Sequence, residues 1–518
     1  MQIYSFSPFG YEGNLVSVEV DIRRGIPAID IVGLADGAVK ESRERMKSAI
    51  RNSGYEFPSE RVLISLSPAD LKKEGAGFDL PVALGVLCAA EASSPKKSGG
   101  ALLDQKTLVM GELELSGAVR PARAVNAAVW TAAAAGIRRC VVPAANADEA
   151  MEVPGMKVFA AENLREAFSA LFDDSSFSGA RVPSDDSLPP DSEEIEGVFF
   201  PSLSESASFG ELFGQKELVR ACQIAAAGGH NLLAFGPPGC GKTLALQNFG
   251  ALLPLLTVEE ARSVTRIHSI AGLMPRGQGL LRKAPFRQPH MSASLEGLCG
   301  GGASCRPGEA SLAHNGVLFL DEAAEFKSSV LQMLRVPLES GSISLSRAGR
   351  TAVYPARFQL LMAANPCPCG NYGSDKKVCL CSSRSVEMYW KKFSAPLLDR
   401  IDIRVKVDLP DCEERERRAF SVKDLRPKIA RAVRIQRERQ KTRNARLGPA
   451  EISLYCRLGK EAKEILDSAV LRHDFSPRAA AACSKIARTI ADMEGSLEII
   501  PEHMAEAVDF RRVEGVLA

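Results

Sequence analysis

Gly236-Pro237-Pro238-Gly239-Cys240-Gly241-Lys242-Thr243 is the stretch that decides the fold, and it fits the phosphate-loop pattern G-x-x-x-x-G-K-[ST]. A short apolar run, residues 231–235, precedes it as a buried strand would, and residues 244–249 suit a helix. In this order, the glycines let backbone N–H groups approach phosphate oxygens, and the helix N-terminus adds partial positive charge. We predict that these eight residues bind ATP, with Lys242 at the β- and γ-phosphates and Thr243 at Mg²⁺. The alternative is a chance glycine turn that binds no nucleotide.

A second apolar strand, residues 317–320, is followed by two carboxylates, Asp321 and Glu322. The carboxyl ends of strands are where open α/β sheets bind ligands. We expect Asp321 to hold Mg²⁺, usually through water, and Glu322 to polarise the attacking water as a general base. The alternative is a strand that ends in a solvated acidic turn.

Three further residues resemble parts of the ring-forming AAA+ ATPases. Asn365, at the end of the apolar run 360–364, is similar to the first sensor, although an asparagine before proline is also a common turn starter. Arg400 resembles an arginine finger that enters the neighbouring subunit's site, and the alternative is an ion pair with a nearby aspartate, residue 399 or 402. Arg478, after a Ser-Pro helix start, resembles the second sensor and is expected to face the nucleotide from a helical lid.

Residues 284–294, 316–322, 363–370 and 396–403 resemble the magnesium-chelatase-type AAA+ proteins of the ComM/YifB family, as do residues 25–36 and 38–45. The likeness spans the chain except for residues 172–207. It implies a homo-oligomer, a hexameric ring, that hydrolyses ATP with Mg²⁺ and drives branch migration of recombining DNA during natural transformation. One departure is visible, because Met291 follows His290 where the family usually shows a histidine pair.

Residues 1–171 alternate between strand and helix patterns and resemble a Lon-type protease domain. The resemblance places Gly77 where such a protease has its serine and Asn126 about where it has its lysine. A serine–lysine dyad needs both partners within hydrogen-bond reach, so we expect a structural or regulatory domain. Lys72, Lys73 and Asp79 could form a site, but we interpret them as solvated charges beside a turn.

The fold class predicted for the whole chain is α/β, in four parts. The Lon-like domain is followed by a flexible acidic linker, residues 172–207, a P-loop AAA+ core with inserts, residues 208–409, and an α-helical lid, residues 410–518. The net charge of +2 over 518 residues indicates no partner by itself. We expect a cytoplasmic protein, since there is no signal-peptide pattern and no membrane-length apolar run, and most of the 13 cysteines are scattered.

Two segments are candidates for DNA contact. Residues 341–355 predict a hairpin with Arg347 and Arg350 near its tip, where related ring ATPases reach into the central pore. An exposed hairpin with solubilising arginines is the alternative. The glycine-rich residues 297–304 predict a mobile loop beside it, and the basic helix 426–443 is either a solvated lid helix or a contact with DNA or a neighbour.

Two C-x-C pairs form a compact set of four cysteines. Thiolates at this density suit tetrahedral Zn²⁺, although typical zinc ribbons use C-x₂-C. Free thiols in a loop are the alternative to a structural zinc site, and the four residues are Cys367, Cys369, Cys379 and Cys381.

An ATP-driven motor on DNA is the function that the sequence favours. The main rival is a chelatase-like motor that remodels a protein partner, and the N-terminal domain argues against it, because plain chelatase motor subunits resemble only the ATPase part. A Lon-like protease is disfavoured by the missing dyad. A nucleotide-dependent scaffold is disfavoured by Glu322 and Arg400.

Overall fold

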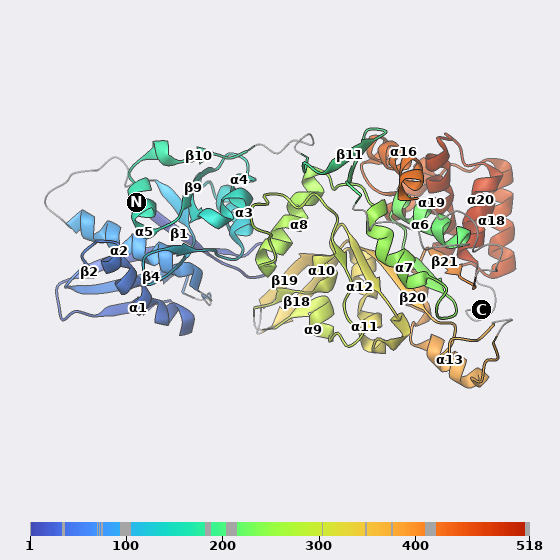
Figure 1. The fold of residues 1–518 in the computed structure, drawn as a ribbon, viewed down its shortest axis with the longest axis horizontal. Helices are drawn as coiled ribbons and strands as arrows, with labels where there is room; N and C mark the ends of the chain where they lie inside the picture. Colours follow the sequence, from blue (N-terminus) through green and yellow to red (C-terminus); the bar gives the residue numbers. More distant parts are fainter. Residues whose placement is uncertain are drawn as a thin grey trace.

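The chain folds into an N-terminal α/β domain, a central α/β core and a C-terminal helical domain, placed side by side along the long axis (Figure 1). The computed structural model describes residues 2–33, 37–69, 71, 73, 76–93, 105–181, 188–203, 215–302, 304–347, 350–373, 377–409 and 421–512. Among the described residues, no helix is both long and apolar enough to span a bilayer.

The N-terminal domain is built on an eight-stranded mixed sheet in the order β10-β9-β8-β5-β1-β2-β4-β3. In β4, every second side chain is buried, as the alternation of apolar and polar residues predicts. The strands are β1 Gln2–Ser7, β2 Asn14–Arg23, β3 Ile29–Val32, β4 Arg61–Ser67, β5 Lys106–Val109, β8 Arg139–Pro143, β9 Lys157–Ala161 and β10 Ser178–Gly179, with a small separate hairpin, β6 Glu112–Leu113 and β7 Val119–Arg120.

Helices cover this sheet, and the central one is apolar on all sides. Residues 80, 82–84 and 86–87 of α2 are all buried, since the helix packs on β2 and lies under α1 and α5. The helices are α1 Gly37–Asn52, α2 Asp79–Ser93, α3 Val125–Ala134, α4 Ala147–Met151 and α5 Leu164–Ala170.

The core has a five-stranded sheet whose neighbouring strands all pair in parallel, in the order β14-β17-β20-β13-β21. Its three inner strands are buried along their whole length, which explains their continuous apolar runs. The strands are β13 Leu232–Phe235, β14 Phe286–Arg287, β17 Val317–Leu320, β20 Gln359–Ala364 and β21 Ile403–Lys406.

Short helices and two small hairpins surround the core sheet. Helix α8 begins with a capping box between Thr257 and Glu260, a pairing that satisfies backbone groups at the helix start. The helices are α6 Lys216–Gly228, α7 Lys242–Gln247, α8 Val258–Ala271, α9 Leu295–Cys299, α10 Glu309–Leu312, α11 Ser328–Met333, α12 Arg335–Ser340, α13 Ser383–Lys391 and α14 Ala395–Leu398, and the hairpins are β15 Gly300–Gly301 with β16 Arg306–Pro307 and β18 Ser342–Arg347 with β19 Arg350–Pro355.

The C-terminal domain is a helical bundle that shares one hydrophobic core with the sheet of the central part. Its central helix, α19, begins with the side chain of Ser476 as N-cap and Pro477 in its first turn. The helices are α16 Val422–Gln440, α17 Pro449–Tyr455, α18 Lys460–His473, α19 Pro477–Glu494 and α20 Pro501–Arg511.

The prediction of a linker without fixed structure is wrong for residues 192–201. They form a hairpin, β11 Ser192–Ile195 with β12 Val198–Pro201, whose Val198 and Phe200 are buried in the core shared with the helical domain. The acidic residues of this segment have a structural use, because Glu193 pairs with the buried Arg426 of α16 at 3.2 Å. Local composition did not reveal this, since the partner lies more than two hundred residues away.

The basic helix is likewise covered in part. In α16, Arg431 and Arg434 both reach Glu196, at 2.9 Å and 3.8 Å. The hairpin β11–β12 therefore neutralises part of the charge that made this helix a candidate for DNA contact.

The N-terminal domain docks on the core through α8 and the hairpin β18–β19. The backbone N–H of Ala124 donates to Ser269 O at 2.9 Å, and the Ser269 hydroxyl donates to Glu149 Oε2 at 2.7 Å. Burial raises the pKa of the Glu149 carboxyl. At the hairpin, the Arg350 guanidinium lies 3.6 Å from the centre of the Phe9 ring.

Candidate functional site

The phosphate-loop stretch joins β13 to α7, as its sequence predicts. Gly241 has φ +87°, a left-handed conformation that favours glycine, and a Cβ at Gly236 would lie 1.9 Å from Val407 O. The Lys242 ammonium is buried and donates to the carbonyls of Gly236 and Pro237, each at 2.7 Å. The loop thus holds its only cation directly at the backbone that would surround the phosphates.

The ends of three neighbouring strands meet at one cavity of about 430 Å³. The end of β13 contributes the phosphate loop, the end of β17 contributes Asp321 and Glu322, and the end of β20 contributes Asn365. The three motifs that the sequence singled out separately are therefore brought together at the carboxyl edge of the parallel sheet.

Thr243 and Asp321 form a pair of oxygen ligands in this cavity. The Thr243 hydroxyl donates to Asp321 Oδ1 at 3.0 Å, and the backbone N–H of Glu322 donates to the same oxygen at 3.0 Å. Hydroxyl and carboxylate oxygens are the donors that Mg²⁺ prefers, so these residues fit a Mg²⁺ site.

Glu322 stands in a strained backbone conformation at the exposed side of the cavity. Its φ and ψ are both 47°, in the left-handed region that side chains with a Cβ rarely occupy. Such strain persists where the surrounding structure enforces it, and it occurs often at active sites. The turn directs the Glu322 side chain away from the buried strand and into the pocket lining.

Arg400 lies at the opposite edge of the same sheet, which is the edge formed by the amino ends of the strands. It precedes β21, which pairs with β13 in the register Leu232–Ile403, and its carbonyl accepts from Asn231 Nδ2 at 2.9 Å. The phosphate loop follows the other end of β13. At about 3.3 Å per strand residue, roughly 13 Å of sheet separate the two positions.

The partner of Arg400 is Glu339 of α12, and neither aspartate named as an alternative takes that place. Its guanidinium forms an ion pair with Glu339 Oε2 and donates to Pro396 O at 2.7 Å. Asp399 instead pairs with Arg511, and Asp402 lies beside His230. The sequence gives no local indication of Glu339, because α12 is 61 residues away in the chain.

Arg478, which is expected from the sequence to face the nucleotide from the helical lid, lies beside Glu339 and away from the phosphate loop of its own chain. Arg478 does not line the cavity of the phosphate loop, and its Nη2 lies 3.7 Å from Glu339 Oε1. Since Glu339 also binds Arg400, the two arginines share one carboxylate at the far edge of the sheet. The helical domain packs at this edge, which the helix pattern alone does not reveal.

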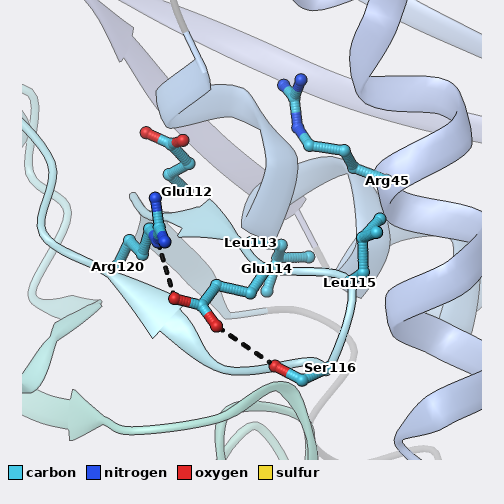
Figure 2. Close-up of a pocket in the computed structure, with 7 residues that line it drawn as sticks. All are labelled: Arg45, Glu112, Leu113, Glu114, Leu115, Ser116 and Arg120. Atoms are coloured by element: carbon cyan, nitrogen blue, oxygen red, sulfur yellow. Dashed lines mark hydrogen bonds and ion pairs between the residues drawn. The ribbon is translucent and has the colours of Figure 1, made fainter.

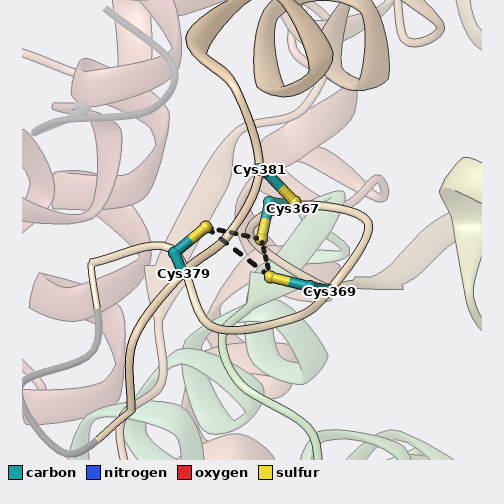
Figure 3. Close-up of side chains that lie close together, drawn as sticks. All are labelled: Cys367, Cys369, Cys379 and Cys381. Carbon is teal, nitrogen blue, oxygen red and sulfur yellow. Dashed lines mark hydrogen bonds between the residues drawn. The ribbon is translucent and has the colours of Figure 1, made fainter.

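The four cysteines of the two C-x-C pairs converge at one point between β20 and α13 (Figure 3). Their sulfur atoms lie within 4.8 Å of one another, with Cys367 3.3 Å from Cys369 and 3.7 Å from Cys379. Four sulfurs at about 2.3 Å from a tetrahedral zinc would lie roughly 3.8 Å apart. The geometry therefore fits the predicted zinc ligands.

The cysteine cluster adjoins the phosphate loop. A Cβ on Gly370 would lie 2.7 Å from Pro238 Cδ, and Cys367 follows Asn365 by two residues. The loop that carries the cysteines is thus in contact with the carboxyl edge of the sheet, on the side of the nucleotide cavity.

The hairpin predicted over residues 341–355 is present, and Arg347 pairs with Arg350 at its end. Arg350 stacks on Phe9 as described above, and Arg347 lies 3.9 Å from Glu296 of α9. The glycine-rich run beside it is not a wholly free loop, because residues 300–301 pair with 306–307. A hydrophobic cluster of this hairpin with Tyr11 and Ile270 ties the region to the N-terminal domain.

In the N-terminal domain, the interpretation of Asp79 and Lys73 as solvated charges is wrong. Both side chains are fully buried: Asp79 binds Arg45 at 3.0 Å and Lys73 donates to Pro68 O. Burial raises the pKa of the Asp79 carboxyl, and the bond from Arg45 opposes that rise. Lys72 lies outside the described residues.

The structure also describes Gly77 and Asn126, the two positions compared with the serine and lysine of a Lon dyad. Asn126 donates through Nδ2 to Glu149 O at 2.9 Å inside the domain junction, and Gly77 lines a separate cavity of about 470 Å³ that Tyr354 and Arg306 also line. A shallower cavity of about 380 Å³ lies beside Arg45, where Arg120 pairs with Glu114 at 2.7 Å (Figure 2).

A cavity formed by a phosphate loop, an acidic strand end and a polar strand end defines the class of P-loop ATPases. Family profiles place the chain within that class: Magnesium chelatase, subunit ChlI, matches residues 208–415; Subunit ChlI of Mg-chelatase matches 18–146; and Magnesium chelatase, subunit ChlI C-terminal, matches 420–511.

Whole-chain relatives agree with these profiles. The chain is 38% identical over 518 residues to the uncharacterized protein YifB of Escherichia coli, covering 99% of this chain and 97% of YifB. It is 36% identical over 520 residues to the competence protein ComM of Haemophilus influenzae, covering 99% and 98%. The magnesium-chelatase 38 kDa subunit of Acidiphilium rubrum matches 30% of the chain and 52% of its own length, at 30% identity. The chain belongs to the magnesium-chelatase ChlI-type ATPases and is a YifB/ComM homologue.

Proposed function

We propose that the chain is an ATP-hydrolysing ring motor, assembled as a hexamer, that acts on DNA as a branch-migration helicase in recombination during natural transformation. The observation that carries the ring is the division of the site: the phosphate loop and Arg400 lie at opposite edges of one parallel sheet. An arginine so placed cannot reach the nucleotide of its own chain, and in this proposal it serves the nucleotide of the next copy.

Each residue of the cavity has a role in this proposal. Lys242 and the loop backbone bind the phosphates, while Thr243 and Asp321 hold Mg²⁺, which neutralises developing phosphate charge when bound. Glu322 accepts the proton of the attacking water, and Asn365 orients that water.

The neighbouring copy supplies the remaining charge. Arg400 stabilises the charge that develops on the transferring phosphoryl group, and Arg478, which shares Glu339 with it, enters the same site from the helical domain. In this proposal the second sensor therefore acts between copies.

Two lines support DNA as the substrate. The hairpin β18–β19 carries Arg347 and Arg350 as its terminal pair, and two arginines at the end of a hairpin suit phosphate contact. A relative that matches over its whole length is named a competence protein. The rival function, remodelling of a protein partner, takes its support from the three profiles named for a magnesium-chelatase subunit and from a chelatase subunit that matches 30% of the chain.

The test of the substrate is ATPase turnover with single-stranded, duplex and branched DNA, beside a sample without DNA. We expect stimulation, strongest on branched DNA, and loss of that stimulation in an Arg347→Ala/Arg350→Ala variant that keeps its basal turnover. Absence of stimulation by any of the three DNAs favours the protein-remodelling motor.

The test of the ring is complementation. An Arg400→Ala chain keeps its phosphate loop and a Lys242→Ala chain keeps its finger, so mixed rings contain some interfaces with both. We expect each variant alone to be nearly inactive and the mixture to regain part of the turnover. If light scattering shows that mixed assemblies form and these assemblies are inactive, the trans arrangement is contradicted.

A further inference from the structure

We propose that Glu339 is a positioning residue of the ATPase centre, which binds Arg400 and Arg478 at once so that both guanidinium groups meet the neighbouring nucleotide as one unit. The inference rests on the trans arrangement proposed above and adds to it a residue that does not line the phosphate-loop cavity of its own chain. In space, Glu339 lies together with Arg400 and Arg478. In the sequence, it belongs to neither the arginine-finger motif nor the second-sensor motif.

The first support is the geometry of the carboxylate. Oε2 of Glu339 binds Arg400 and Oε1 lies 3.7 Å from Arg478 Nη2, so each oxygen faces one arginine. Two guanidinium groups this close repel each other unless a negative charge lies between them. The hydrogen bond from Arg400 holds the pKa of Glu339 below its usual range, so the carboxylate stays ionised at neutral pH.

The second support is the exposure of the three side chains. Arg400 is only 11% exposed, whereas Glu339 and Arg478 are 59% and 44% exposed. A surface ion pair by itself adds little stability. A carboxylate that covers a nearly buried arginine at the surface of the core instead fixes where that arginine lies before a partner arrives.

The third support is a separate set of hydrogen bonds between the turn that bears Arg400 and the start of α19, which bears Arg478. Asp399, next to Arg400, accepts a hydrogen bond from the Ser476 hydroxyl at 3.0 Å, and Ser476 lies two residues before Arg478. Arg511 of α20 binds Asp399 Oδ1 at 3.1 Å. The core turn and the start of α19 are therefore joined independently of Glu339, so its removal is expected to disorder the two guanidinium groups without separating the domains.

The experiment uses Glu339→Gln in the full-length chain, which keeps the shape of the side chain and removes its charge. We expect kcat to fall about 10-fold or more, in keeping with the sensitivity of catalysis to small misplacements. The KM for ATP and the affinity for a fluorescent ATP analogue stay within about two-fold of the unaltered chain, because the phosphate loop is untouched and the fold intact.

The matched control is Glu114→Gln, which removes another exposed glutamate paired with an arginine, Arg120 at 2.7 Å in the N-terminal domain. We expect no change in kcat from this variant, since loss of an exposed ion pair costs little. A kcat for Glu339→Gln that equals the control overturns the positioning role.

Complementation then shows on which chain Glu339 acts. In the mixture of Lys242→Ala and Arg400→Ala chains, the Lys242→Ala chain supplies the arginines. Adding Glu339→Gln to that chain is expected to abolish the regained turnover, whereas adding it to the Arg400→Ala chain leaves the regained turnover unchanged. Equal effects on both chains, or none on either, contradict the inference.

The two proposals fail in different ways. If the parent mixture of Lys242→Ala and Arg400→Ala stays inactive although assemblies form, the trans arrangement is wrong. If Glu339→Gln still lowers kcat in that case, Glu339 affects turnover by another route, and the inference that it positions arginines for the neighbouring nucleotide is also wrong. If the parent mixture works and Glu339→Gln behaves like the unaltered chain, only the inference on Glu339 is wrong.

Discussion

The two edges of the core sheet differ in how their functional residues are placed. At the carboxyl edge, the phosphate loop, Asp321–Glu322 and Asn365 each follow directly on a buried strand, and adjacent strands bring them to one cavity. At the amino edge, Arg400, Arg478 and Glu339 come from a turn, a helix of the C-terminal domain and α12. The first set is placed by strand order and the second only by the packing of separate elements.

The largest effect expected from this comparison separates binding from turnover. Arg400→Ala is expected to lower kcat by about 10³-fold or more, as for fingers supplied in trans, and to leave ATP affinity unchanged. Lys242→Ala is expected to abolish binding, because the loop loses its only cation. Both are measured by titration of a fluorescent ATP analogue beside steady-state turnover. Weak ATP binding by Arg400→Ala contradicts a role confined to the chemical step.

A loss with a lower minimum is expected within the carboxyl edge. Glu322→Gln keeps the side-chain volume but cannot accept the proton of water, so kcat is expected to fall by about 10²- to 10⁴-fold. Nucleotide affinity is retained, since Lys242 and Thr243 are unchanged. Glu325→Gln, an exposed glutamate three residues on, is the control. Turnover near that of the unaltered chain excludes Glu322 as the base.

The contrast also explains which features the sequence revealed. Strands β13, β17 and β20 and the residues after them were predictable, because a buried parallel strand is a continuous apolar run and its ligand residues follow in the chain. The α/β class, the hairpin of residues 342–355 and the helices of the C-terminal domain have the same local origin. The nearness of the four cysteines was visible in their spacing.

Features that depend on distant partners were not predictable. Asp79 looked like a solvated charge because its partner, Arg45, lies on another helix, and Glu193 looked like linker because Arg426 follows 233 residues later. The position of Arg478 beside Glu339 was not predictable, because a helix pattern does not show at which edge of the sheet the helix packs. Residues 208–214, the start of the predicted core, lie outside the described part of the chain.

The cysteine cluster offers a test confined to the carboxyl edge. We expect about one zinc per chain in protein purified without chelator, by metal analysis, and its loss in Cys367→Ser. Since Gly370 contacts Pro238 of the phosphate loop, loss of zinc is expected to weaken ATP affinity several-fold. Arg400 of such a chain is intact, so mixing this chain with Arg400→Ala is still expected to restore part of the turnover. Cys88→Ser, in the N-terminal domain, is the control and keeps its zinc. Absence of metal with four freely reactive thiols refutes the site.

The smallest effect concerns the hydrogen bond by which Ser476 joins the start of α19 to Asp399 at the amino edge. The Ser476 hydroxyl accepts a hydrogen bond from the Ala479 N–H at 3.1 Å as N-cap of α19, and it also donates to Asp399 at 3.0 Å. Ser476→Ala is expected to cost about 0.5–2 kcal/mol of stability through the cap alone, measured by denaturant unfolding.

The control separates the two hydrogen bonds of that hydroxyl. Ser421 caps α16 of the same helical domain through Lys423 N at 3.2 Å and is expected to show a similar stability loss as Ser421→Ala. Only Ser476→Ala is expected to lower kcat, by a few-fold, because only it loosens the turn that bears Arg400 relative to the helix that bears Arg478. If the two variants have equal turnover, Glu339 and Arg511 hold this edge together without Ser476. The hydrogen bond from Ser476 to Asp399 then has no role in positioning Arg400.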